Sequence, residues 1–161
     1  MKTDRVERIA FRFTKAEIQS LLKLMGEKEL PGASLSAQEA DDLSVNSLVD
    51  GGVVMPCGEM TLVDRTITLI LRSAARAKSR IELNSAAGTA VLYAGEKMCV
   101  LIAQDQTAVV RVEPIENVRA AHKPLNEAAA RLGDGMAASL VRGQETLAGD
   151  IAQLLEQLDR Q

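Results

Sequence analysis

The sequence predicts an α+β fold in which an antiparallel sheet packs with N-terminal helices and a C-terminal helical layer. Three observations predict it. One strand pattern opens the chain, three helical patterns follow, and four strand patterns then come in succession with short turns between them. Segregated runs of this kind are typical of α+β domains rather than of alternating βαβ units. We therefore expect a single domain over residues 1–161.

The chain opens with a strand that leads into a capped helix. The stretch VERIAFRF, residues 6–13, alternates between apolar and charged residues, which is the period-two pattern of a half-buried strand. The residues TKAE that follow are a capping box, in which Thr14 and Glu17 can each satisfy a backbone N–H group of the other. Apolar residues at helical spacing then continue to Gly26, which we expect to end the helix.

A second helix is predicted over residues 36–50. It begins at a second capping box, SAQE, and ends at a glycine pair, one member of which can take the left-handed conformation of a helix C-cap. Leu43 and Leu48 are expected on its inner stripe, because they recur at helical spacing.

A third helix is predicted over residues 62–78. It follows a short extended piece, VVM, and a turn, PCG, and it is expected to be capped by Thr61 with Asp64. Its expected inward positions are Leu62, Leu69, Ile70 and Ser73.

Four strands are predicted next, over residues 80–84, 89–94, 98–104 and 108–112. They are alternating or β-branched runs, and the short segments SAAG, GEK and DQ separate them. Such a succession predicts a meander of antiparallel strands. We expect Pro114 to end the sheet, because proline cannot donate to a strand ladder.

The remainder is predicted to be helical. Residues 115–132 have a helical composition, but Pro124 is expected to break or kink the helix near Ala121 or His122. After a joint at GDG, residues 136–161 are expected to form a C-terminal amphipathic helix. Its apolar stripe consists of Leu140, Leu147, Ile151, Leu154, Leu155 and Leu158.

Composition and charge narrow the classes of function. The chain has two phenylalanines, one tyrosine and no tryptophan, so side chains on which bases or sugars could stack are scarce. A net charge of −3 argues against nucleic acid or anionic lipid as the main partner. No apolar run reaches the ~20 residues of a membrane span, and the charged N-terminus is unlike a signal peptide. We therefore expect a cytoplasmic protein without a membrane span.

No catalytic site, cofactor or metal is predicted. His122 is the single histidine and has no neighbouring serine or cysteine in sequence, so no nucleophilic triad is indicated. Cys57 and Cys99 lie far apart and lack metal-site spacing, so we expect packing or surface roles in a reducing compartment. Asp41 and Asp42 would diverge by about 100° around a helix and could not act as a carboxylate pair.

One basic cluster stands out. The stretch RSAARAKSR carries Arg72, Arg76 and Lys78 without an intervening acid, and the two arginines share a helix face because they are four residues apart. A phosphate backbone could be held there, which keeps a winged-helix-like nucleic-acid-binding regulator as the alternative function. Cations in the last turn of a helix are explained at least as well by its dipole. The would-be recognition helix, TLVDRTITLIL, is also apolar on too many sides to lie in a groove.

Several stretches together carry a family resemblance. They are the opening strand and helix RIAFRFTKAEIQSLLKLMG, the proline-bearing loop ELPGASLS, the helix end SLVDGGVV, and the following RTITLILRSAARAKSRIELN. On these stretches, as far as about residue 110, the chain resembles the EspG family, the cytoplasmic secretion-associated chaperones of type VII secretion systems. Members of that family are typically longer and close with further sheet and helical-bundle elements that grip secreted helical substrates.

The resemblance implies a non-enzymatic cytoplasmic protein that binds another protein, such as a secreted helical substrate. We expect the contact on an open sheet edge or on the C-terminal helix, through Leu147, Ile151, Leu154 and Leu158. The same stripe could meet a second copy of the chain and form a homodimer.

Overall fold

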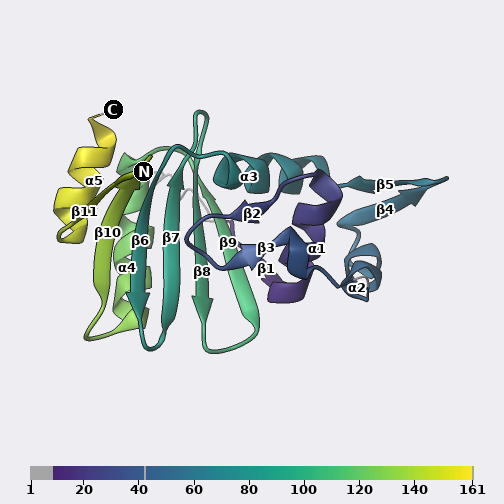
Figure 1. The fold of residues 1–161 in the computed structure, drawn as a ribbon, viewed down its shortest axis with the longest axis horizontal. Helices are drawn as coiled ribbons and strands as arrows, with labels where there is room; N and C mark the ends of the chain where they lie inside the picture. Colours follow the sequence, from purple (N-terminus) through teal and green to yellow (C-terminus); the bar gives the residue numbers. More distant parts are fainter. Residues whose placement is uncertain (1–8, 42, 161) are drawn as a thin grey trace, which may run out of the picture.

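The computed structural model describes residues 9–41 and 43–160, so residues 6–8 of the expected first strand, Asp42 and Gln161 lie outside the described residues. Its centre is a seven-stranded antiparallel sheet (Figure 1). In spatial order the strands are β1 (Phe11–Thr14), β9 (Val109–Ile115), β8 (Cys99–Asp105), β7 (Gly88–Ala94), β6 (Ser79–Ser85), β10 (Ala137–Arg142) and β11 (Glu145–Ala148). The predicted N-terminal strand and meander are thus neighbours in one sheet, and the predicted α+β class is confirmed.

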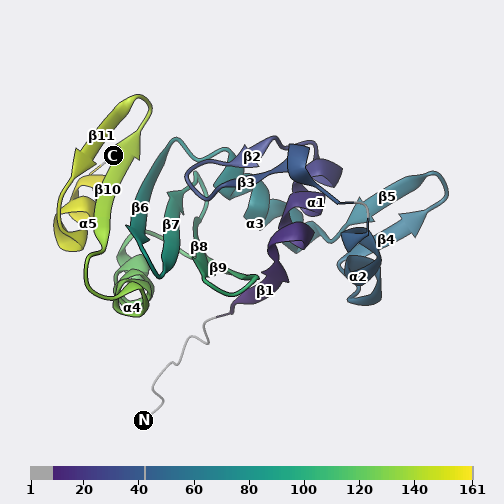
Figure 2. The same ribbon diagram turned by 60° about the horizontal axis from the view of Figure 1, so that its bottom comes forward.

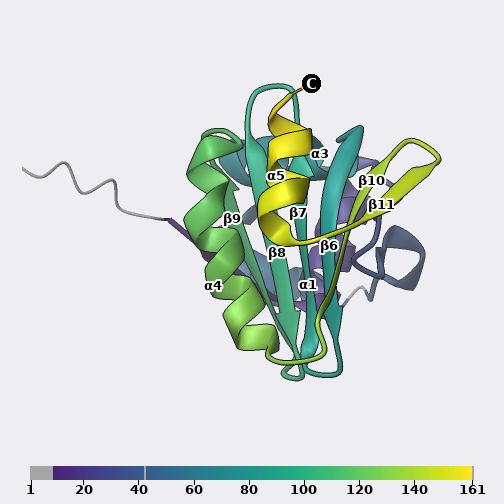
Figure 3. The ribbon, with the colours of Figure 1, turned by 90° about the vertical axis from the view of Figure 1, so that its left-hand side faces the viewer.

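Helices cover both faces of the sheet. On one side lie α1 (Lys15–Met25) and α3 (Arg65–Ala75), and on the other lie α4 (His122–Leu132) and α5 (Ile151–Asp159), as Figures 1 and 3 show. We call these sides the α1 face and the α4 face. The predicted N-terminal helices and C-terminal helical layer therefore lie on opposite faces.

Each face has its own apolar core, because successive residues of a strand point to opposite sides. On β7, Val91 and Tyr93 pack in the α1-face core, whereas Ala90 and Leu92 pack in the α4-face core. The strand is therefore buried on both faces, which explains why TAVLYA reads as a nearly continuous apolar run.

In the described residues the first strand begins only at Phe11, later than the prediction over residues 6–13, but the capping of α1 follows the prediction closely. The hydroxyl of Thr14 accepts from the Glu17 N–H at 3.1 Å, and the Glu17 carboxylate accepts from the Thr14 N–H at 2.8 Å. The helix α1 ends at Gly26, whose φ of 76° is in the left-handed region. The predicted capping box and C-cap are both confirmed.

The predicted helix over residues 36–50 is wrong in its first half. Two short strands, β2 (Glu29–Leu30) and β3 (Leu35–Ser36), pair with each other, and Ser36 caps only the single 3-10 turn η1 (Ala37–Glu39). The backbone is extended at Ala40, so the helix α2 (Ser44–Asp50) begins later. As a result Leu48 is buried, but Leu43 precedes the helix and is exposed.

The predicted third helix also begins later than expected. The strands β4 (Val54–Cys57) and β5 (Met60–Val63) form a hairpin, so Thr61 and Leu62 lie in a strand and Asp64 alone caps α3. The later start rotates the buried stripe of the helix. Only Ile70 of the expected inward positions is buried, and Leu69 is exposed. The buried residues of α3 are Ile67, Ile70, Leu71 and Ala74.

The two prolines expected to interrupt structure are accommodated. Strand β9 continues through Pro114, contrary to the prediction, because Phe11 of β1 lies opposite Val112 and Pro114 therefore has a strand neighbour on β8 only. Pro124 lies in the first turn of α4, where backbone N–H groups have no helical acceptor. The predicted helix over residues 115–132 is therefore confirmed only from His122 onward: Ile115 belongs to β9, and a single 3-10 turn, η2 (Arg119–Ala121), precedes α4.

The prediction of one helix over residues 136–161 differs most from the structure. Its first half is the hairpin β10–β11, in which Leu140 lies opposite Leu147 and the turn contains Gly143 at φ 61°. Strand β10 also pairs with β6, and this pairing outweighs the helical spacing of the leucines. Within residues 136–160, which the structure describes, only α5 is helical, and it begins at a capping box between Asp150 and Gln153.

Candidate functional site

The β4–β5 hairpin projects from the end of the molecule opposite β11 (Figures 1 and 2). In its register Met55 lies opposite Leu62 and Cys57 lies opposite Met60. Directly opposite residues of an antiparallel pair share a face, so these four side chains form one apolar surface, which we call the hairpin apolar face. Met55, Met60 and Leu62 are 64%, 67% and 46% exposed. The described part of the chain therefore leaves this surface open to solvent.

The base of the hairpin is fixed to the domain. Val54, on the opposite face of the hairpin, is buried in the α1-face core. The Val53 N–H donates to the Leu48 carbonyl at 3.0 Å, and the Asp64 N–H donates to the Val53 carbonyl at 2.7 Å. The Asp64 carboxylate in turn accepts from the Ile67 N–H at 3.0 Å and so caps α3. A two-stranded hairpin is marginal alone in water, and these contacts supply its support.

Sequence reasoning missed the hairpin apolar face because it continued the third helix back into β5. The signal was present, since a turn containing Gly58 separates two short apolar runs of equal length. Gly58 has a φ of 62°, which a tight hairpin turn commonly requires.

The leucine stripe predicted as a binding surface is divided by the structure. Leu154 and Leu158 are 0% and 3% exposed in the α4-face core, and Ile151 is half-buried against it. Leu147 lies outside the helix, on β11, and is 50% exposed. The helix α5 does close a layer with α4, as expected. Because that packing uses Leu154 and Leu158, the expectation that these two side chains face a partner is wrong.

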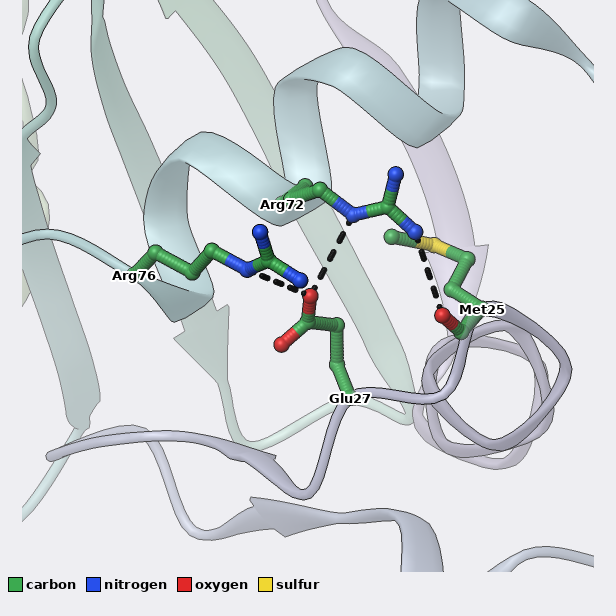
Figure 4. Close-up of polar contacts among 4 residues, drawn as sticks. All are labelled: Met25, Glu27, Arg72 and Arg76. Atoms are coloured by element: carbon green, nitrogen blue, oxygen red, sulfur yellow. Dashed lines mark hydrogen bonds and ion pairs between the residues drawn. The ribbon is translucent and has the colours of Figure 1, made fainter.

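The predicted basic cluster contacts an acid that is remote in sequence (Figure 4). The Nε atoms of Arg72 and Arg76 lie 3.2 and 2.9 Å from the same Oε1 atom of Glu27. Arg72 Nη2 also donates to the Met25 carbonyl at 3.1 Å. The two arginines therefore tie the end of α3 to the segment after α1, and Glu27 offsets part of their charge. Lys78 is exposed just beyond the helix.

The other candidate groups lie apart from one another. His122 is exposed at the start of α4, Cys57 is exposed on the hairpin, and Cys99 is buried on β8. Burial raises the pKa of the Cys99 thiol from 9.0 to about 11. The Asp41 carboxylate accepts from the Leu43 N–H at 2.9 Å. Within residues 9–41 and 43–160, no three His, Cys, Asp or Glu side chains are grouped so that they could hold a metal ion.

No protein-family model matches the chain, and no curated protein matches its sequence. Among the helices described, none is both long and apolar enough to cross a membrane.

Proposed function

We propose that this chain is a non-enzymatic, chaperone-like factor that binds another protein through the hairpin apolar face. The observation that carries the proposal is the presence of four apolar side chains on one exposed face of an anchored, projecting hairpin. Contiguous exposed apolar surface of this kind marks protein contacts. Two of the four residues are methionines, whose flexible thioether side chains adapt to partners of different shape.

The partner we propose is an apolar helical segment of another protein, such as a secreted substrate of a type VII secretion system. The EspG-like stretches support this choice, because SLVDGGVV leads directly into β4. A cytoplasmic location belongs to the same proposal, since a chaperone must meet its substrate before secretion. The hairpin offers apolar contact area rather than paired charges, which suits the apolar stripe of an amphipathic helix.

To test the proposal, the tagged full chain is purified from its native cells and the protein that co-purifies with it is identified. The affinity of that partner protein is then measured for wild type and for variants of the chain. We expect Met55→Asp with Met60→Asp to weaken binding at least about tenfold, because it places two charges on the contact surface. Leu147→Asp is the matched control, since it adds a charge to an exposed apolar position on β11. Equal affinity of the hairpin variant and wild type would contradict the proposal.

Two further measurements separate the competing interpretations. A winged-helix-like regulator would bind duplex DNA with an affinity that falls steeply with salt, and Arg72→Ala with Arg76→Ala would reduce that slope. A sub-micromolar complex with this behaviour would replace our proposal.

Homodimer formation would appear as a doubled mass in light scattering, and we expect the hairpin variant to abolish it if the hairpin apolar face binds a second copy.

A further inference from the structure

A cavity of about 500 Å³ lies on the α4 face, at the end of the sheet formed by β1, β9 and β8. Three arginines from three different elements line it: Arg12 of β1, Arg111 of β9 and Arg131 of α4. Apolar side chains, among them Ala103 and Ala128, make up most of the remaining lining, and the polar residues Thr89, Gln104 and Asp105 complete it. The cavity is on the opposite side of the sheet from the core that anchors the hairpin, so it does not depend on the proposed function.

The strand register explains how the cavity forms. In one row across the sheet, Arg12 lies opposite Arg111, Arg111 lies opposite Ala103, and Ala103 lies opposite Ala90. Directly opposite residues share a face, with Cβ atoms about 4.5–5.5 Å apart. Two long cations therefore stand beside two methyl groups, and the short side chains leave space next to the arginines. Residues three apart share a helix face, so α4 can bring Ala128 and Arg131 to the same cavity.

Among the described residues, the cations of the cavity are only partly neutralised. Arg12 and Arg111 are a like-charge pair directly across two strands, an arrangement that is ordinarily destabilising. Two acids on the described strands lie at this end of the sheet, and Glu127 lies one turn before Arg131 on α4. Asp105 accepts at one carboxylate oxygen from both the backbone N–H and the hydroxyl of Thr107. The other acid, Glu113, is buried 3.7 Å from an Nη atom of Arg111.

Arg111 retains a buried donor that has no acceptor. Among the described residues its Nε atom is buried and makes no hydrogen bond. Strand β6 has the same Arg-x-Glu spacing, and there Arg80 Nε donates to Glu82 Oε2 at 2.7 Å. The Arg-x-Glu spacing is thus able to close a short ion pair, but on β9 it does not. Buried polar groups are ordinarily satisfied, so the open donor indicates a group positioned for an acceptor outside the described chain.

We propose that this cavity binds a small aliphatic anion, with its carboxylate or phosphate held by Arg12, Arg111 and Arg131 and its apolar part on Ala90, Ala103 and Ala128. Arginine is suited to both head groups because its planar guanidinium pairs with them bidentately. The volume is within the roughly 300–1,000 Å³ typical of small-molecule sites. The residues that line the cavity include no aromatic side chain, which favours an aliphatic body over an aromatic ring.

The test is calorimetric titration of the purified full chain at low ionic strength with octanoate and octyl phosphate. Octan-1-ol and inorganic phosphate are the controls that lack the charge or the apolar chain. We expect at least one of the two anions to bind with one-to-one stoichiometry, and octan-1-ol and inorganic phosphate to bind at least about tenfold more weakly. The better anion identifies the head group. Failure of both anions to bind up to ~10 mM, or equal binding of octan-1-ol, would overturn the proposal.

Variants locate the site. Arg111→Gln removes the central cation, and Ala103→Leu fills the cavity without changing the charge; each should weaken binding at least about tenfold. Arg119→Gln is the matched control, because it removes an exposed arginine outside the cavity, and its affinity should equal that of wild type. If Arg111→Gln fails to fold, Arg12→Gln with Arg131→Gln replaces it, since both residues are exposed. Wild-type affinity in the charge-removal variants would show that the anion binds elsewhere and that the proposal is wrong.

Discussion

Each face of the sheet carries a group of charged side chains beside its apolar core, and the two groups differ in what covers them. On the α1 face, the charged side chains are those of Arg80 and Glu82 on β6, which form a short ion pair. The segment between β2 and β3 closes over that face, because the Tyr93 hydroxyl donates to the Pro31 carbonyl at 2.5 Å and Gln104 Nε2 donates to the Ala33 carbonyl at 2.6 Å. On the α4 face, the charged side chains are those of Arg12 on β1 and Arg111 on β9, and they line a cavity rather than lying under a covering segment.

This difference shows that an arginine on a sheet face can serve either packing or binding, according to what covers it. Arg80 and Glu82 lie so close to the covering segment that a Cβ atom at Gly32 would be 2.7 Å from Glu82 Oε2. Arg111 lies beside alanines, and its Nε atom has no acceptor in the described part of the chain. The residue type is the same, and the neighbouring elements decide its role.

The largest effect is expected from Leu154→Asp, which tests whether α5 completes the α4-face core. Leu154 is fully buried, so the variant must place a carboxyl group among apolar side chains. We expect it to lower the free energy of unfolding by more than about 4 kcal/mol in urea denaturation. Leu147→Asp, at an exposed position, should change that free energy by no more than about 0.5–1 kcal/mol. Similar effects of the two variants would contradict the placement of α5 in the core.

A smaller effect is expected from Gly32→Ala, which tests the cover of the α1 face. Gly32 has a φ of 79°, and its added methyl group would also push against the Arg80–Glu82 pair. We expect a loss of about 2–3 kcal/mol in the free energy of unfolding, from backbone strain together with the disturbed ion pair.

Gly26→Ala is the matched control for Gly32→Ala, because Gly26 has a φ of 76° and open space around it. It should cost only the backbone term of about 1 kcal/mol. If the two glycine variants lost the same stability, the covering segment would not press on the ion pair.

The free energy of unfolding should fall at alkaline pH because each face buries one group that loses a proton there, the Cys99 thiol or the Tyr93 hydroxyl. Burial raises the pKa of the Cys99 thiol to about 11 on the α4 face, and it raises the pKa of Tyr93 well above its ordinary value on the α1 face. The unfolded state releases these protons more readily, so the stabilisation is complete below the unfolded pKa and is lost as pH rises through the folded pKa. For Cys99 that loss extends from about pH 9 to about pH 11.

Between pH 7 and 11, the free energy of unfolding should decrease less in Cys99→Ala than in wild type, by on the order of 1 kcal/mol, as measured by thermal unfolding. Cys57→Ala, at the exposed hairpin thiol, should leave the pH dependence unchanged. An identical alkaline profile for Cys99→Ala and wild type would show that the Cys99 thiol is not protected by burial.

The smallest effect is expected from Arg12→Gln, which tests the like-charge pair in the cavity. Removing one of two directly opposed cations should raise the free energy of unfolding by about 0.2–0.5 kcal/mol at low salt, and the gain should shrink at ~1 M salt because of screening. Arg80→Gln should instead lower stability by about 1 kcal/mol, since it leaves Glu82 without its short ion pair. A stability loss in Arg12→Gln equal to that in Arg80→Gln would remove the contrast between the two faces.

Sequence reasoning succeeded where the decisive contacts are local. The capping box at Thr14, the left-handed C-cap at Gly26 and the meander from β6 to β9 join residues that are few positions apart or lie in adjacent strands. It failed at the hairpins β4–β5 and β10–β11, where Leu62 in the first and Leu140 and Leu147 in the second were assigned to predicted helices. There the pairing of β10 with β6 and the burial of Val54 against the α1-face core favour strands.

The sequence by itself determined the α+β class and the order of the main helices and of the meander, because these follow from hydrophobic period and turn residues. Only the tertiary structure decided which polar residues meet. Glu27 contacts Arg72 and Arg76, and Arg12 lies across from Arg111, although long stretches of chain separate them. The physical reason is that hydrogen bonding within helices and turns depends on near neighbours, whereas the charge balance of a cavity depends on strand order and register.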